Sequence, residues 1–355
     1  MPEEVAGETV IVTGIRNRLN RKLPFAQMRV SLAGIDLSDK IDPRLISLSI
    51  CEKRGNEADQ LDLVLHDRDG DLEIPKTGAL LKVELGWKYG ENLPIGLIDK
   101  GSFKVDEISI AGPPDLITIR ARSADLTRNF RNRTAQAFIG KSVGEIIDAI
   151  AAKNGIRAMV DQELRGEIVP AIARNHQSDA ALLRELGRRF DAVATVKNQI
   201  LIFSRIGGET ASGLVIPKLT ISRRDTSSFS YSQVEHQNHN GTEAVYRNRQ
   251  TAQHLTVREG HNEQSPRNPH RLRHVHHNEN DARQRARAHH RRTKRGKFKL
   301  ELDLALGRPD YYPNRQVNVS GFKAEIDAKS WLIAEATHSL DGSGGLQTKL
   351  SLETA

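Results

Sequence analysis

The sequence predicts a mainly β protein with an α+β insertion, and three observations support this. Short segments in the first third of the chain alternate apolar and polar residues with period two. The period changes to that of helices near residue 141, and strand-like segments return from about residue 214. Period two is typical of half-buried strands, and apolar residues three and four apart are typical of helices. At 355 residues the chain exceeds what one hydrophobic core usually serves, so we expect at least two domains.

The first strand-rich region contains six candidate strands. Gly, Pro and Asp residues separate them, as in the turn at 67–71 and the Gly112-Pro113-Pro114 breaker. The six segments are residues 29–32, 45–50, 61–66, 80–87, 103–110 and 116–121. Short alternating strands at fairly regular spacing predict a sandwich or a barrel.

The middle of the chain, residues 133–205, predicts a small α/β unit. Ser142 and Glu145 form a capping box, which begins a helix that ends at Asn154-Gly155. A second helix is predicted to begin at Ser178 as N-cap. The apolar residues expected to be buried on the two helices are Ile146, Ile147, Ile150, Ala151, Leu182, Leu183, Leu186 and Phe190. Two short strands, 192–196 and 200–203, complete the unit.

Strands resume in the last third, but a basic segment interrupts them. The candidate strands are residues 219–222, 228–234, 243–246, 298–306, 315–319, 331–336 and 348–353. Ten of the thirteen histidines lie between His236 and His290, together with many arginines. From Asp281 to Gly296 neither Gly nor Pro interrupts the chain, and three alanines favour a helix. This helix shows almost no apolar face, so we expect it to be solvated or to bind a partner.

The sequence assigns no catalytic, cofactor-binding or metal-binding residue. Nucleotide-binding and hydrolase motifs are missing, and the Asp67–Asp71 turn lacks the Glu that a calcium loop needs at position 12, where Gly78 stands. Cys51 is the single cysteine, which excludes a disulfide framework and a Cys-based zinc site. His270, His274, His276 and His277 have spacings that allow a metal, but the neighbouring arginines repel a cation, so a solvated basic face is favoured. The start MPEEVAGETVIVTG is neither a signal peptide nor a membrane anchor, and no apolar run is long enough to span a bilayer, so we expect a cytoplasmic, soluble chain without membrane insertion.

The basic segment predicts an interaction with an acidic partner. The formal net charge is +8, and much of the excess lies here. The arginines chosen as candidate partner contacts are Arg283, Arg285, Arg287, Arg291 and Arg292. A nucleic-acid-binding regulator is the alternative, since such a run also suits phosphates. Aromatic residues for base stacking and recognised DNA-binding motifs are missing, so nucleic acid is the less favoured partner.

The two strand-rich regions share a spacing that suggests an internal repeat. Pro75 stands eight residues before Val83, as Pro309 does before Val317. The segment 103–109 also matches 331–337, with an aromatic residue, a β-branched residue two later and a Glu four later. Chance similarity between alternating strands is the other interpretation.

These residues resemble the phage late control D proteins, the baseplate or tail-tip hub proteins of contractile-tailed phages and related particles. The most specific match is Gly101 to Glu107 followed by Gly112 to Asp115. The other matching segments are 59–63, 67–70, 78–87, 143–155, 177–191, 331–340 and 348–350, so the resemblance covers about residues 29 to 355. The density of His and Arg between 254 and 295 departs from the family pattern.

The resemblance implies a non-enzymatic homotrimer with two tube-like β-barrel domains per chain. Such a trimer forms a pseudo-six-fold ring that adapts a hexameric tail tube to a trimeric spike. The expected domains are a first barrel at 9–132, the small α/β domain at 133–205, a second barrel split into 206–254 and 297–355, and a basic helical excursion at 255–296. The implied partners are the tail tube protein, the tail spike protein, other baseplate proteins and the tape-measure protein. The implied location is the tail baseplate of a virion or a tail-like particle, assembled in the host bacterial cytoplasm.

Overall fold

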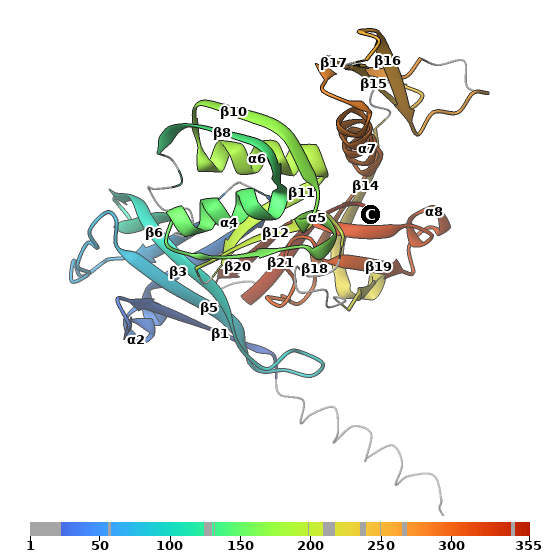
Figure 1. The fold of residues 1–355 in the computed structure, drawn as a ribbon. Helices are drawn as coiled ribbons and strands as arrows, with labels where there is room; N and C mark the ends of the chain where they lie inside the picture. Colours follow the sequence, from blue (N-terminus) through green and yellow to red (C-terminus); the bar gives the residue numbers. More distant parts are fainter. Residues whose placement is uncertain are drawn as a thin grey trace, which may run out of the picture.

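The computed structural model describes residues 23–55, 58–123, 130, 132–197, 199–208, 217–234, 239–248, 250–264, 268–341 and 345–355. The expected start of the first barrel at residue 9 lies outside these residues. Within them the chain is mainly β, as predicted (Figure 1). No helix among them is long and apolar enough to cross a bilayer.

The first module, residues 25–123, contains all six strands predicted there. They are β1 (Phe25–Leu32), β3 (Leu45–Lys53), β4 (Gln60–His66), β5 (Leu80–Tyr89), β6 (Gly96–Ala111) and β7 (Leu116–Ser123). A two-residue strand β2 (Ile35–Asp36), the short helix α2 (Ser38–Ile41) and the 3-10 turn η1 (Asp42–Arg44) connect β1 to β3. The strands lie in the order β3-β4-β7-β6-β5-β1-β2. Alternate residues such as Leu48, Ile50, Leu61 and Leu63 are buried in its core, as period two requires.

The second module, residues 219–233 with 298–354, also has six strands. They are β13 (Leu219–Ser222), β14 (Thr226–Gln233), β18 (Phe298–Leu304), β19 (Gln316–Ser320), β20 (Ser330–Asp341) and β21 (Gly345–Thr354). The 3-10 turn η2 (Arg223–Asp225) and the short helix α8 (Ala324–Asp327) connect them. Their spatial order is β14-β18-β21-β20-β19-β13 around a separate core that holds Trp331.

The two modules have the same strand order, which confirms the predicted repeat. If β1, β3, β4, β5, β6 and β7 are numbered one to six, and the second module likewise, both sheets read 2-3-6-5-4-1. One pair differs, because β1 runs antiparallel to β5 whereas β13 runs parallel to β19. The sequence alignment of one strand pair was wrong by two residues. Phe103 and Trp331 occupy equivalent positions in the two modules. Leu81 faces Phe103 and Val317 faces Trp331, so Leu81, and not Val83, is the equivalent of Val317. The ladder between β5 and β6 is irregular at Val83.

The modules are joined into one thirteen-stranded sheet by pairing of β20 with β3. The path of ladders is open, with β14 at one end and β2 at the other. Among the described residues neither module therefore closes on itself through its ladders. The expected pair of barrels within a chain is not confirmed.

Residues 133–205 form an α/β unit with its own core (green in Figure 1). Its helices are α4 (Val143–Lys153), α5 (Gln162–Arg165) and α6 (Asp179–Phe190). Its strands are β8 (Arg133–Ser142), β9 (Arg157–Val160), β10 (Ile168–Ser178), β11 (Ala192–Lys197) and β12 (Ile200–Arg205). The Ser142–Glu145 capping box, the Ser178 cap and all eight predicted buried residues of the two helices are confirmed.

The basic segment folds differently from the expected helical excursion. Among the described residues of this segment only α7 (Glu279–Arg295) is helical, and it packs on a three-stranded sheet of β15 (Thr242–Arg247), β16 (His254–Glu259) and β17 (His270–His276). The helix also has an apolar face, which was missed because alanine forms it. Ala282 and Ala286 are fully buried against Ala244 and Val257. Their small side chains let the helix lie close to the sheet.

Candidate assembly surfaces

Strand β20 serves both modules, and it changes its neighbour at a β-bulge. Up to Ile333, one edge of β20 lies beside the β19 segment, and Ile333 accepts a hydrogen bond from Asn314 N at 2.9 Å. From Glu335 to Asp341 the same edge pairs with β3 of the first module. The irregularity that separates the two stretches lies at Ala334. One continuous strand therefore forms the joint between the modules, which we call the internal seam.

A buried ionic network lies across the internal seam. The Lys100 ammonium donates to the Glu52 carboxylate at 2.6 Å, and both side chains are less than 5% exposed. His338 is fully buried, with Nε2 3.2 Å from the same Glu52 oxygen and 3.2 Å from the Tyr311 carbonyl. Its Nδ1 lies 2.9 Å from the Thr348 hydroxyl. Because Glu52 and Lys100 come from the first module and the others from the second, the network fixes how the modules pair.

His338 is held neutral in this network. Burial lowers its pKa below the usual value, and Lys100 lowers it further, although the Glu52 carboxylate opposes both effects. The two neighbours of Nε2 are acceptors only, so Nε2 carries the proton and donates. The Thr348 hydroxyl then donates to Nδ1, while it accepts from Arg308 N at 2.8 Å. Every polar atom of the ring is thereby satisfied.

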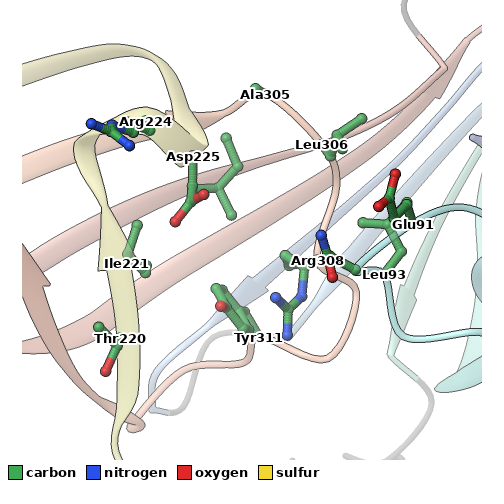
Figure 2. A pocket seen from close by; sticks show the side chains of 12 residues that line it. Glu91, Leu93, Thr220, Ile221, Arg224, Asp225, Ala305, Leu306, Arg308 and Tyr311 are labelled. Atoms are coloured by element: carbon green, nitrogen blue, oxygen red, sulfur yellow. The ribbon is translucent and has the colours of Figure 1, made fainter. Parts of the chain in front are cut away.

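A second contact between the modules borders a shallow cavity of about 310 Å³. The Trp87 indole donates to the Gly307 carbonyl at 2.9 Å, which ties β5 to the loop after β18. Figure 2 shows Glu91 and Leu93 of the first module facing Arg308 and Tyr311 of the second. Arg308 makes two hydrogen bonds to Asp310, at 2.8 and 2.7 Å, and stacks on Tyr311. Its charge is therefore neutralised within the chain.

Among the described residues, the strand edges without a neighbouring strand include one on β6 in the first module and one on β14 in the second. On β6, the segment before β5 covers the outer edge only as far as Val105, and Asp106–Ala111 continue without a neighbour there. On β14, β18 covers one edge and the opposite edge is open along its whole length. Both edges expose apolar side chains, with Ile110 57% and Phe229 41% exposed. Open edges of this kind are templates for pairing with another chain.

The five arginines proposed from the sequence all lie on α7, but they differ in their surroundings. Arg283 and Arg287 pair with Glu259, and Arg283 also pairs with Glu279. Arg285 pairs with the buried Asp281. Arg292 donates to the Arg188 carbonyl of the α/β unit. Arg291 is exposed, so it presents its charge to solvent most directly.

The histidines considered as metal ligands are not brought together. His276 is buried beside Asp281, with its Nδ1 3.7 Å from the carboxylate, whereas His274 and His277 are exposed. His270 stacks on His289 at 4.6 Å between ring centroids. Burial and the adjacent imidazole lower the pKa of His289 to about 4, so this pair is neutral at physiological pH. In the described part of the chain, no group of three His, Cys, Asp or Glu residues is arranged to hold a metal.

Sequence reasoning missed the residues of the buried network, although a signal existed. Glu52 continues the inward-facing series Leu48 and Ile50, and His338 stands between the inward-facing Ala336 and Leu340. A charged or titratable residue at an inward position of an alternating strand is rare unless it has a partner. Period-two register therefore marks such residues as candidates for a buried ionic contact.

Comparison with known proteins agrees with this architecture. Residues 60–344 match the family described as phage tail baseplate hub (GPD). The chain is 32% identical to the protein named probable baseplate hub protein of Escherichia phage 186, covering 97% of this chain and 96% of the relative. It is 33% identical to the protein of the same name from Escherichia phage P2, covering 90% of each.

Similarity to a solved structure extends over almost the whole chain. The 43 kDa tail protein of prophage MuSo2 from Shewanella oneidensis superposes with a TM-score of 0.67 at 15% identity, covering 92% of this chain and 97% of that protein. This match concerns the fold, while the matches to the phage 186 and P2 proteins establish the family. The chain belongs to the phage tail baseplate hub family.

Proposed function

We propose that three copies of this baseplate hub form a pseudo-six-fold ring that adapts a hexameric tail tube to a trimeric spike. The observation that carries the proposal is the repeat: two modules of the same strand order are joined edge to edge within one chain. If the same joint recurs between chains, the contact is head-to-tail, and a closed ring leaves neither the β6 edge nor the β14 edge unpaired. Three chains then supply six modules.

The ring also accounts for the missing closure within a chain. The path from β14 to β6 contains eight strands: β14, β18, β21, β20, β3, β4, β7 and β6. Three chains would contribute 24 such strands to one barrel, so closure occurs between chains. Barrels of more than about 16 strands are wide enough to surround a channel. The tube-like character belongs to the ring in this proposal.

The insertions give the ring its three-fold side. The α/β unit at 133–205 follows the first module, and the basic unit of β15, β16, β17 and α7 is inserted into the second module. Each occurs once per chain and therefore three times in a trimer. We assign the repeated modules to the contact with the six-fold tail tube, and the inserted units to contacts with the spike and other three-fold components, including the tape-measure protein. This role is structural and uses no catalytic residue.

Arg291 is the preferred partner contact among the five arginines, because the others contact groups of their own chain. Charge reversal by Arg291→Glu is expected to reduce incorporation of the hub into tail particles, with unchanged folding. Arg283→Glu is the comparison, since it would disturb the contacts to Glu279 and Glu259 as well. Normal particle assembly with Arg291→Glu would remove this residue from the proposed interface.

Mass measurement of the purified full-length chain tests the ring. Light scattering and native mass spectrometry are expected to give a species of three times 39.5 kDa. Class averages from electron microscopy should show six similar lobes with three-fold decoration. A stable dimer, or a monomer at every concentration, would contradict the proposal.

Binding to nucleic acid through the basic segment is the second candidate, favoured only by the charge of α7. A mobility-shift titration at increasing salt separates the two. Binding that survives moderate salt would support the regulator, whereas retention only at low salt reflects non-specific charge.

A further inference from the structure

We propose that the joint between chains is an antiparallel pairing of the β6 edge of one chain with the β14 edge of the next, with Ser109 opposite Ser232. This rests on the trimer proposed above and specifies how that trimer is held together. The register is read from the internal seam, because β6 is the equivalent of β20 and β14 is the equivalent of β3.

The equivalence of β6 with β20 extends to single hydrogen bonds. Their ladders with β7 and β21 are interrupted at Asp106 and at Ala334, respectively. Just before each bulge, Val105 N donates to Ala79 O at 2.9 Å, and Ile333 N donates to Arg315 O at 3.0 Å. In return, Gly78 N donates to Val105 O at 2.8 Å, and Asn314 N donates to Ile333 O at 2.9 Å. Gly78 and Asn314 both have a positive φ. Residue 109 therefore occupies the position that residue 337 occupies in β20.

The equivalence of β14 with β3 is equally close. The ladder to β4 is irregular between Leu45 and Ser47, and the ladder to β18 is irregular between Thr226 and Ser228. Beyond these points Leu48 faces Leu63 of β4, as Phe229 faces Leu302 of β18. Counting along each strand places Ser232 at the position of Cys51.

Combining the two gives the register of the proposed joint. In the internal seam Thr337 lies opposite Cys51 and His338 lies opposite Ile50. Between chains, Ser109 then lies opposite Ser232, and Ile110 lies opposite Tyr231. Five residue pairs fit, from Glu107 with Val234 to Ala111 with Ser230, before the turn at 112–115 ends β6.

Exposure supports this occupant. Ile110 is 57% exposed, whereas its equivalent in the internal seam, His338, is fully buried. Ile110 is thus uncovered in the single chain, at a position that strand β3 covers in the internal seam. The chemistry of the two joints differs, because Glu52 and His338 of the internal seam correspond to Gln233 and Ile110. The joint between chains is uncharged where the internal seam is ionic.

Disulfide trapping tests the register in the full-length chain. In a Cys51→Ser background, Ser109→Cys with Ser232→Cys should oxidise to a covalent species of three chains on a non-reducing gel. Ser109→Cys with Ser230→Cys is the offset control, because diagonal neighbours lie about 7–8 Å apart, beyond easy disulfide reach. Ser49→Cys with Ser339→Cys, a directly opposed pair of the internal seam, should form a bond within one chain and shows that oxidation is efficient.

A charge substitution tests the same joint independently of oxidation. Ile110→Glu should shift the trimer to monomers, raising the concentration needed for half-assembly at least about tenfold, the cost of losing one well-packed interface residue. Folding should be unaffected, because Ile110 is exposed in the single chain. Ile139→Glu is the matched control: Ile139 is 74% exposed on β8, away from both edges, and the trimer should persist.

Failure of the joint and failure of the trimer give different results. A trimer that cross-links at the offset pair, or not at all, or that survives Ile110→Glu, overturns the joint and leaves the ring intact. A parent chain that never trimerises overturns the ring and the joint together. A covalent trimer through Ser109 and Ser232, with dissociation by Ile110→Glu but not by Ile139→Glu, supports the joint.

Discussion

Replacing Lys100 by Met should destabilise the two β modules by about 3–5 kcal/mol, the cost of removing one partner of a buried ion pair. The Lys100 ammonium lies 2.6 Å from Glu52, and both side chains are less than 5% exposed. At an effective dielectric constant of about 20, two unit charges at this distance attract by about 6 kcal/mol, so the substitution removes a large term. Lys100→Met leaves the Glu52 carboxylate buried, with the His338 Nε2–H at 3.2 Å as a remaining donor.

Urea unfolding followed by tryptophan fluorescence is the appropriate assay. The chain has two tryptophans, and Trp87 and Trp331 are both buried in the β modules, so their signal reports the modules and not the inserted units. With an m-value of about 3 kcal/mol/M, the midpoint should fall by about 1–1.7 M. Lys82→Met is the matched control. Lys82 pairs with Glu84 at 3.2 Å but is 47% exposed, so its loss should lower the midpoint far less.

A double substitution separates the ion pair from simple packing. Glu52→Gln together with Lys100→Met removes both charges, and most of the lost stability should return. If Lys100→Met and Lys82→Met lower the midpoint equally, the buried pair does not stabilise the internal seam. The same conclusion follows if the double variant is as unstable as Lys100→Met alone.

Three further outcomes follow from individual groups. Burial lowers the pKa of His338 in the folded chain, so the unfolded chain binds more protons below about pH 6.5. The stability of the β modules should therefore be constant above this pH and should fall below it, by up to about 1.4 kcal/mol per pH unit. His338→Gln should flatten this profile in the fluorescence assay. An unchanged slope in that variant would assign the effect to another group. Burial raises the pKa of the Cys51 thiol to about 11, so its reaction with a disulfide reagent at pH 8 should be about 100-fold slower than that of an exposed thiol and should become fast in urea; rapid labelling of the folded chain would contradict this environment. Ser142→Ala removes the hydroxyl that accepts from Glu145 N at 3.2 Å. Hydrogen exchange in the first turn of α4 should therefore accelerate by the factor that corresponds to a loss of about 1 kcal/mol of stability, while exchange in α6 stays unchanged. Equal acceleration in both helices would indicate a global effect.

The sequence predicts elements well where one face of a regular structure is apolar. The strands of both modules and helices α4 and α6 bury alternate or periodic apolar residues, and their caps are local. Strand β10 was missed because Pro170 interrupts it, and proline argues against a strand. Strand β17 was missed because six of its seven residues in HRLRHVH are exposed or half-buried and mostly basic, so no alternation is visible.

The repeat could be recognised from sequence, but its register could not. A β-bulge inserts one residue without an obvious sequence signal, and at Val83 the register of β5 with β6 shifts by one position. The pairing of β3 with β20, which joins the two modules, could likewise not be predicted from the sequence, because the two strands lie almost 300 residues apart. The five arginines of α7 were identified by their charge alone. The i,i+4 pairs of Arg283 with Glu279 and of Arg285 with Asp281 follow from the helix itself, whereas the pairs with Glu259 of β16 depend on how α7 packs on its sheet.

The shared strand β20 has a consequence for how a ring would come apart. Because one uninterrupted polypeptide crosses every second boundary, half-rings and single modules are never free species, and whole chains are the units of exchange. In the proposed ring, the remaining three boundaries would be held by strand pairing and uncharged side-chain contacts. Mild detergent should therefore open a ring at alternate boundaries, whereas acid should first weaken the boundaries inside each chain, where His338 lies.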